Sequence, residues 1–202
     1  MTGNRIKKIG QMDFERLTKL QQLYLDNNEI ATIEEGAFEA LKALEVLILA
    51  NNLLFRLPGN LFDQQSKLVI LWLSGNNMVY FPIPGWNEET GEISSTSTLG
   101  KLRKLHIDMN PLQCQCVDLI KSWAKLKNIR LGIDNDYVKN GLQPACIIND
   151  QGCRTDIGKD FIHNYWHLFN NETYINMLYK EEDERSPAFW IIQRVFESLF
   201  DL

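Results

Sequence analysis

The sequence predicts an α/β repeat fold: a solenoid of parallel strands with a disulfide-bonded C-terminal cap and a helical tail. The first observation is a hydrophobic framework that recurs every 24 residues. The second is that all four cysteines follow the last copy of this framework. The third is an apolar segment with helical spacing close to the end of the 202-residue chain. We therefore expect repeats over residues 1–112, a cap over 113–159 and a tail over 160–202.

The repeat length follows from three copies of the pattern L-x-x-L-x-L-x-x-N-x-L, each 24 residues after the last. The copies are Leu20–Leu23–Leu25–Asn28–Ile30, Leu44–Leu47–Leu49–Asn52–Leu54 and Leu68–Leu71–Leu73–Asn76–Met78. A single coil of this length cannot bury its own leucines, so each coil must use its neighbours as the other half of its core. The pattern therefore predicts stacked coils.

Within each coil the Leu-x-Leu stretch is expected to form a short strand whose leucines point inward. The asparagine that follows can both donate and accept hydrogen bonds through its amide. It can therefore satisfy the backbone groups that leave strand pairing where the chain bends inward. Stacked strands with looser returns on the outside predict a curved solenoid that is concave on its strand side.

One coil is longer than the others, because the fourth framework, Leu102–Leu112, starts 34 residues after Leu68. The extra residues fall within Pro82–Thr98, where Pro, Gly, Ser and Thr cluster as in a loop. The loop is either a tolerated insertion without a role or a carrier of binding contacts, as loops on rigid scaffolds often are. In the second case we expect Trp86 to be an exposed contact residue.

The first residues match the second half of a repeat, because Asn4, Ile6, Ile9 and Phe14 precede their counterparts by 24 positions. A solenoid needs a terminal cap to shield its last core layer. We expect the chain to be an N-terminally incomplete piece of a longer protein. The alternative is that Met1–Leu20 forms an improvised cap. These residues do not have the layout of a secretory signal.

The cysteines indicate an oxidising compartment. Four of them gathered in one segment, Cys114, Cys116, Cys146 and Cys153, favour disulfides that close the terminal core layer. A zinc site is disfavoured because the spacing is C-x-C and no histidine lies nearby. A redox site would need C-x-x-C, which the chain lacks.

The segment NPLQCQCVDLIKSWAKL resembles the opening of the C-terminal flanking cap of extracellular leucine-rich repeat proteins. Slit-like, Toll-like and variable-lymphocyte-receptor-like ectodomains carry such caps, and the resemblance covers roughly residues 4–155. It implies the disulfides Cys114–Cys146 and Cys116–Cys153. The chain departs from the family in that Cys146 comes late, with only six residues before Cys153.

The helix expected at Val117–Leu126 places Ile120, Trp123 and Ala124 on one side and lysines on the other. Trp123 should therefore be a lid on the last leucine layer, where its burial would contribute about 2–3 kcal/mol.

The tail carries one N-glycosylation sequon at Asn171. Ser186-Pro187 then predicts the start of a helix with Phe189, Ile192, Phe196 and Leu199 on one face. We expect this helix to dock onto the cap; a partner-binding or self-associating helix is the alternative. No stretch reaches the roughly 18 consecutive apolar residues of a membrane span.

Catalytic and metal chemistry are not indicated. His163 and His167 have a spacing that can chelate a metal on a helix, yet no third ligand accompanies them. No nucleophile elbow, phosphate loop or acid pair is present. The net charge of −5, without a basic patch, argues against nucleic acid as a partner. The chain is predicted to be no enzyme and to need no cofactor or metal.

Function is expected on the outward strand positions of the concave side, where strand alternation cannot place core residues. The middle positions, Tyr24, Ile48, Trp72 and His106, form an aromatic and apolar line, and such exposed groups usually mark an interaction surface. The predicted binding residues are Tyr24, Asp26, Ile48, Ile70, Trp72, Lys104 and His106. Alternatively, the tail covers this surface, or the exposed apolar surface is merely tolerated. The leading prediction is an extracellular module that binds a protein ligand or co-receptor; a self-associating matrix component and a fragment of a receptor ectodomain are the alternatives.

Overall fold

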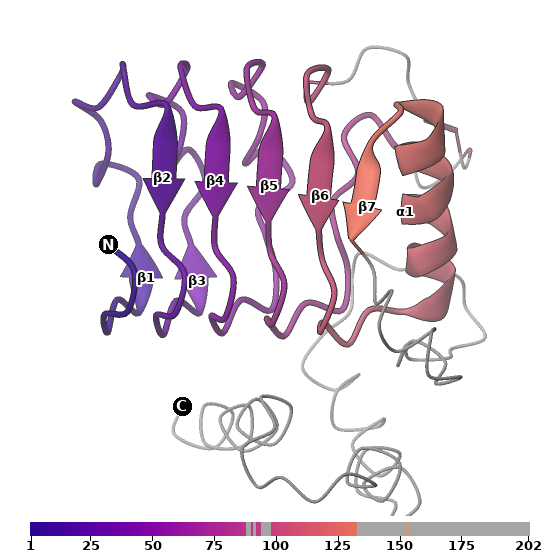
Figure 1. Ribbon diagram of the computed structural model, residues 1–202, viewed down its shortest axis with the longest axis horizontal. Helices are drawn as coiled ribbons and strands as arrows, with labels where there is room; N and C mark the ends of the chain where they lie inside the picture. Colours follow the sequence, from indigo (N-terminus) through magenta and orange to yellow (C-terminus); the bar gives the residue numbers. More distant parts are fainter. Residues whose placement is uncertain (88–89, 91, 94–97, 133–152, 154–202) are drawn as a thin grey trace, which may run out of the picture.

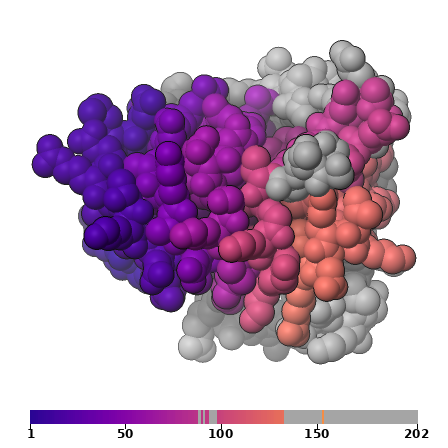
Figure 2. Space-filling view, turned by 90° about the horizontal axis from the view of Figure 1, so that it is seen from above, coloured from indigo at the N-terminus to yellow at the C-terminus, as the bar shows by residue number. Residues whose placement is uncertain are grey.

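The computed structural model describes residues 1–87, 90, 92–93, 98–132 and 153, and these residues form a stack of parallel coils (Figure 1). Five strands make one parallel sheet in the order β2-β4-β5-β6-β7, and two more, β1 and β3, pair at the opposite end of the coils. The sheet strands are β2 (Gln22–Tyr24), β4 (Val46–Ile48), β5 (Ile70–Trp72), β6 (Lys104–His106) and β7 (Arg130–Gly132); the other pair is β1 (Lys8–Ile9) and β3 (Thr32–Ile33). The predicted α/β repeat fold with parallel strands is confirmed. Figure 2 shows the repeats following one another in chain order.

The register of the sheet repeats the spacing of the sequence. Leu23, Leu47 and Leu71 are successive Cα partners 24 residues apart, and Leu71 pairs with Leu105 across the longer coil. These strand leucines are buried, with Leu47, Leu71 and Leu105 at 0% exposure. The register of the strands is therefore kept across the longer coil.

The predicted role of the asparagines is confirmed by a ladder of hydrogen bonds. The side-chain amide of Asn52 donates to the carbonyl of Leu49 in its own coil and to that of Leu25 in the coil before, both at 3.0 Å. Its Oδ1 accepts the backbone N–H of Ile30 at 3.0 Å. The equivalent bonds recur at Asn76 and Asn110. The four ladder asparagines are buried, since none is more than 8% exposed: Asn28, Asn52, Asn76 and Asn110.

The residue before each ladder asparagine adopts a left-handed backbone conformation that turns the chain inward. The φ values are 55° at Asn27, 54° at Asn51, 67° at Gly75 and 52° at Met109. Asparagine and glycine tolerate this region best. The amide of Asn51 also donates to Oδ1 of Asn27 at 3.1 Å, so these positions form a second, exposed row of contacts.

The described part of the inserted loop contradicts the expectation of an exposed Trp86. Trp86 is partly buried and packs against the core, and its backbone forms an antiparallel bridge with Ile93. Its ring centroid lies 6.3 Å from that of Tyr80. An indole brings a large apolar area, so packing it against neighbouring apolar groups is favoured over leaving it in water.

Helix α1 (Cys114–Leu126) closes the far end of the stack (Figure 1). It buries Val117, Ile120, Trp123 and Ala124 against the last coil, and Trp123 is 0% exposed, with its ring 6.0 Å from that of Phe81. Cys116 is bonded to Cys153, the pairing that the family resemblance implies. Cys114 is also disulfide-bonded, while Cys146 lies outside the described residues.

After α1 the chain returns to the sheet and adds β7 beside β6. Leu131 continues the inward leucine column next to Leu105. This fifth strand lies within the segment predicted to be cap, and no repeat pattern marks it in the sequence. The tail over 160–202, with Asn171, His163 and His167, lies outside the described residues.

Candidate binding face

The outward side chains of the five-stranded sheet form the face that the sequence predicts to be concave, which we call the concave face. These are the flanking positions Gln22, Val46, Ile70, Lys104 and Arg130 and the middle positions Tyr24, Ile48, Trp72, His106 and Gly132, each row in register across the strands. Strand alternation puts them opposite the buried leucines. The structure therefore brings the predicted residues Tyr24, Ile48, Ile70, Trp72, Lys104 and His106 onto one surface.

Two aromatic side chains of this face are large exposed hydrophobic groups. Tyr24, on the edge strand β2, is 42% exposed, and Trp72, on the central strand β5, is 38% exposed. Between them Ile48 is half-buried. We call Val46, Ile48, Ile70 and Trp72 the apolar patch, because their strands β4 and β5 are adjacent and in register.

The rings of Trp72 and His106 stack at one end of the apolar patch. Their centroids are 4.5 Å apart with an interplanar angle of 23°. Gly132 is the next register partner of His106, and a Cβ at this glycine would lie 2.3 Å from Nδ1 of the imidazole. Glycine therefore lets the imidazole keep its place beside the indole. Sequence reasoning missed Gly132 because it did not foresee β7.

The acidic groups of the face are occupied by internal hydrogen bonds. The carboxylate of Asp26 accepts bonds from the Thr2 hydroxyl and the Asn27 amide, both at 2.7 Å. Asp108 accepts a hydrogen bond from the hydroxyl of Ser74. Asp26 was predicted to help orient a partner, and its oxygens already have protein donors.

The basic groups of the face differ from the acidic groups in their contacts. Lys104 and Arg130 are exposed register partners on β6 and β7. Within the described residues neither side chain forms an ion pair or a hydrogen bond. Two positive charges therefore border the apolar patch, and no described residue neutralises them.

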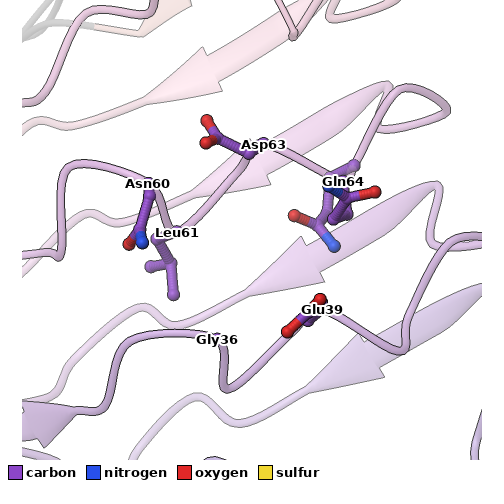
Figure 3. A pocket seen from close by; sticks show the side chains of 7 residues that line it. Gly36, Glu39, Asn60, Leu61, Asp63 and Gln64 are labelled. Atoms are coloured by element: carbon purple, nitrogen blue, oxygen red, sulfur yellow. The ribbon is translucent and has the colours of Figure 1, made fainter.

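A second candidate is a shallow hollow of about 180 Å³ between the coils, away from the strands (Figure 3). It is lined by Gly36, Glu39, Asn60, Leu61, Asp63, Gln64 and Gln65. The two carboxylates, of Glu39 and Asp63, do not point toward one another in Figure 3. In the part of the chain that the structure describes, no group of three or more His, Cys, Asp or Glu side chains could hold a metal ion. The concave face is the better candidate.

One comparison with known proteins agrees with the repeat architecture. The leucine-rich repeat family profile matches residues 1–54 and 18–78. No curated protein matches the chain in sequence. Among the solved structures that match is the crystal structure of a TLR13–ssRNA13 complex, with 25% sequence identity and a TM-score of 0.44. The match covers 56% of this chain and only 18% of that chain. No helix within the described ranges is long and apolar enough to cross a membrane.

Proposed function

We propose that this leucine-rich repeat protein is an extracellular recognition module that binds a protein partner through its concave face. The observation that carries the proposal is the row of large side chains that the sheet leaves exposed, above all Trp72 and Tyr24. Tyr and Trp are the residue types most enriched among the anchors of protein interfaces. A partner that covers Trp72 and Tyr24 would bury apolar area that the fold itself leaves in water.

The rigidity of the scaffold also supports binding. The strands are tied by continuous register and by the asparagine ladder, so the apolar patch is presented in a fixed arrangement. A pre-organised surface loses little conformational entropy when a partner binds. The Trp72–His106 stack restrains the principal anchor in the same way.

The disulfide between Cys116 and Cys153 supports the extracellular assignment. Such bonds persist in oxidising environments and are rare in the cytosol, where thiols are kept reduced. The chain would then meet its partner outside the cell, either as a secreted module or as part of a receptor ectodomain.

The experiment is a binding screen of the purified chain against an array of extracellular proteins, followed by affinity measurements on two variants. Trp72→Ala should weaken binding by more than about 2 kcal/mol, or roughly 30-fold in Kd. Leu126→Ala is the matched control, because Leu126 is an exposed apolar side chain of α1 that lies outside the concave face. An affinity that Trp72→Ala leaves unchanged would remove the concave face as the binding site.

Self-association is a second candidate, favoured by exposed apolar side chains near the N-terminal end. Met1, Met12 and Leu17 are 64%, 70% and 42% exposed. A structural component could assemble through this end. Sedimentation distinguishes the two candidates, since a monomer at all concentrations opposes assembly.

A further inference from the structure

We infer that the concave face selects protein segments that combine an apolar side chain with a carboxylate. The apolar side chain would lie on the apolar patch and the carboxylate over Lys104 and Arg130. This inference rests on the proposed function and specifies the chemistry of its partner.

The charge of the flanking row changes sharply between β5 and β6. The row runs Gln22, Val46, Ile70, Lys104 and Arg130 in register, so two aliphatic residues are followed directly by two cations. Adjacent strands are about 4.8 Å apart, which places Lys104 one strand from Ile70. A short peptide segment crossing the strands can therefore reach both the aliphatic and the cationic positions.

Among the residues that the structure describes, the acidic groups of the face lie too far away to neutralise these cations. Asp108 follows Lys104 by four residues, roughly 13 Å in extended chain, and is bonded to Ser74. Glu45 directly precedes β4. In the sheet, β4 lies two strands from β6, which carries Lys104, so the two strands are about 10 Å apart. The cations are thus available to a ligand, although the chain as a whole has a net charge of −5.

The same features favour a protein segment over nucleic acid. A phosphate backbone is bound by many cations, and its affinity grows with the number of phosphates contacted. Trp72 and Tyr24 could stack on bases, yet Lys104 and Arg130 supply only two charges for a phosphate backbone, and Val46, Ile48 and Ile70 offer a base no hydrogen bonds. A carboxylate next to an aliphatic or aromatic side chain satisfies both halves of the surface, and guanidinium groups pair with carboxylates in a bidentate manner.

The test is a selection of random 16-residue peptides displayed on phage, performed with the wild-type chain and two variants. Peptides selected by the wild type should be enriched in Asp or Glu close to an aromatic or aliphatic residue. For the tightest peptide, the double change Lys104→Glu and Arg130→Glu should raise Kd about tenfold or more, and selection on this variant should favour Lys and Arg instead. Trp72→Ala should abolish enrichment. Circular dichroism spectra should match, since all three residues are exposed.

The outcomes separate the inference from the proposed function. If Trp72→Ala abolishes selection and charge reversal leaves the selected charges unchanged, the inference is wrong and the concave face remains the binding site. If Trp72→Ala has no effect, or no peptide is enriched, both fail. A 20-nucleotide single-stranded RNA that binds the wild type and not the double variant would also overturn the inference, because phosphate would then be the recognised anion.

Discussion

The asparagine ladder should be a main source of stability, and Asn76→Ala tests this. Asn76 is 0% exposed. Its Oδ1 accepts the Leu54 N–H at 3.1 Å, and its amide donates to the carbonyls of Leu49 and Leu73 at 2.9 Å. Both carbonyls also accept a bond from a second ladder asparagine, so only the N–H of Leu54 loses its side-chain acceptor without a substitute.

The expected cost follows from these bonds. A buried donor left unsatisfied costs about 1–3 kcal/mol, and each lost hydrogen bond to a still-bonded carbonyl about 0.5–1.5 kcal/mol. We therefore expect Asn76→Ala to reduce the free energy of unfolding by about 2–6 kcal/mol, a large share of the 5–15 kcal/mol typical of a domain. Asn28→Ala should cost less, because its bonds to Met1 and Ile6 are only partly buried.

Urea unfolding with the disulfides intact measures this difference from the midpoint and slope of the transition. Asn60→Ala is the matched control, since Asn60 is exposed and should change stability by less than about 0.5 kcal/mol. If Asn76→Ala shifts the midpoint no more than Asn60→Ala does, the ladder is not what holds adjacent coils together.

Three other perturbations address the turn, the cap and a surface ion pair. Gly75→Ala should lower stability by about 1–2 kcal/mol in urea, because φ is +67° and the new Cβ would meet Oδ1 of Asn51 at 2.3 Å; an unchanged midpoint would contradict this. Trp123→Ala should cost about 3–5 kcal/mol, since the indole is fully buried, and a cost below 1 kcal/mol would show that it is no lid. Glu34 has its pKa lowered from the ordinary 4.5, first by a hydrogen bond from Lys8 at 2.5 Å. Its contribution to stability is thus present above pH 4.5 and is lost as the pH falls through the lowered pKa; an NMR titration that gives Glu34 the same midpoint in wild type and Lys8→Met would refute the pairing.

The periodic part of the fold was predictable because stacking makes the same demand on every coil. A leucine at each inward strand position and an asparagine at each bend leave a regular trace in the sequence. The register Leu47–Leu71 and the bonds of Asn52 follow directly from the 24-residue step. Trp123 was predictable for a related reason, since a helix that covers an open leucine layer needs a large apolar side chain.

Features that occur once and leave no pattern in the sequence were not predictable. The strand β7 contains a single inward leucine, Leu131, and no repeat pattern surrounds it. Its Gly132, which leaves room for the imidazole of His106, therefore has no signal in the sequence. Trp86 was expected in solvent because its neighbours are loop formers, and tertiary packing of the ring outweighed that local composition. Gln65 takes the core position of Leu41 one repeat later, and only the structure shows its amide donating to the carbonyl of Phe38 at 2.6 Å.

The contrast between the two faces of the same strands bears on function. On the side that faces the hydrophobic core, each strand of the repeats carries a leucine, because packing allows little else. These residues are Leu23, Leu47, Leu71 and Leu105. On the concave face, the row of middle positions changes at every coil, from tyrosine to isoleucine, tryptophan and histidine. Stacking does not require any of these side chains, and an exposed indole contributes less to folding than a buried one. Since the fold leaves these positions free to vary, their large side chains support the proposal that a partner buries them.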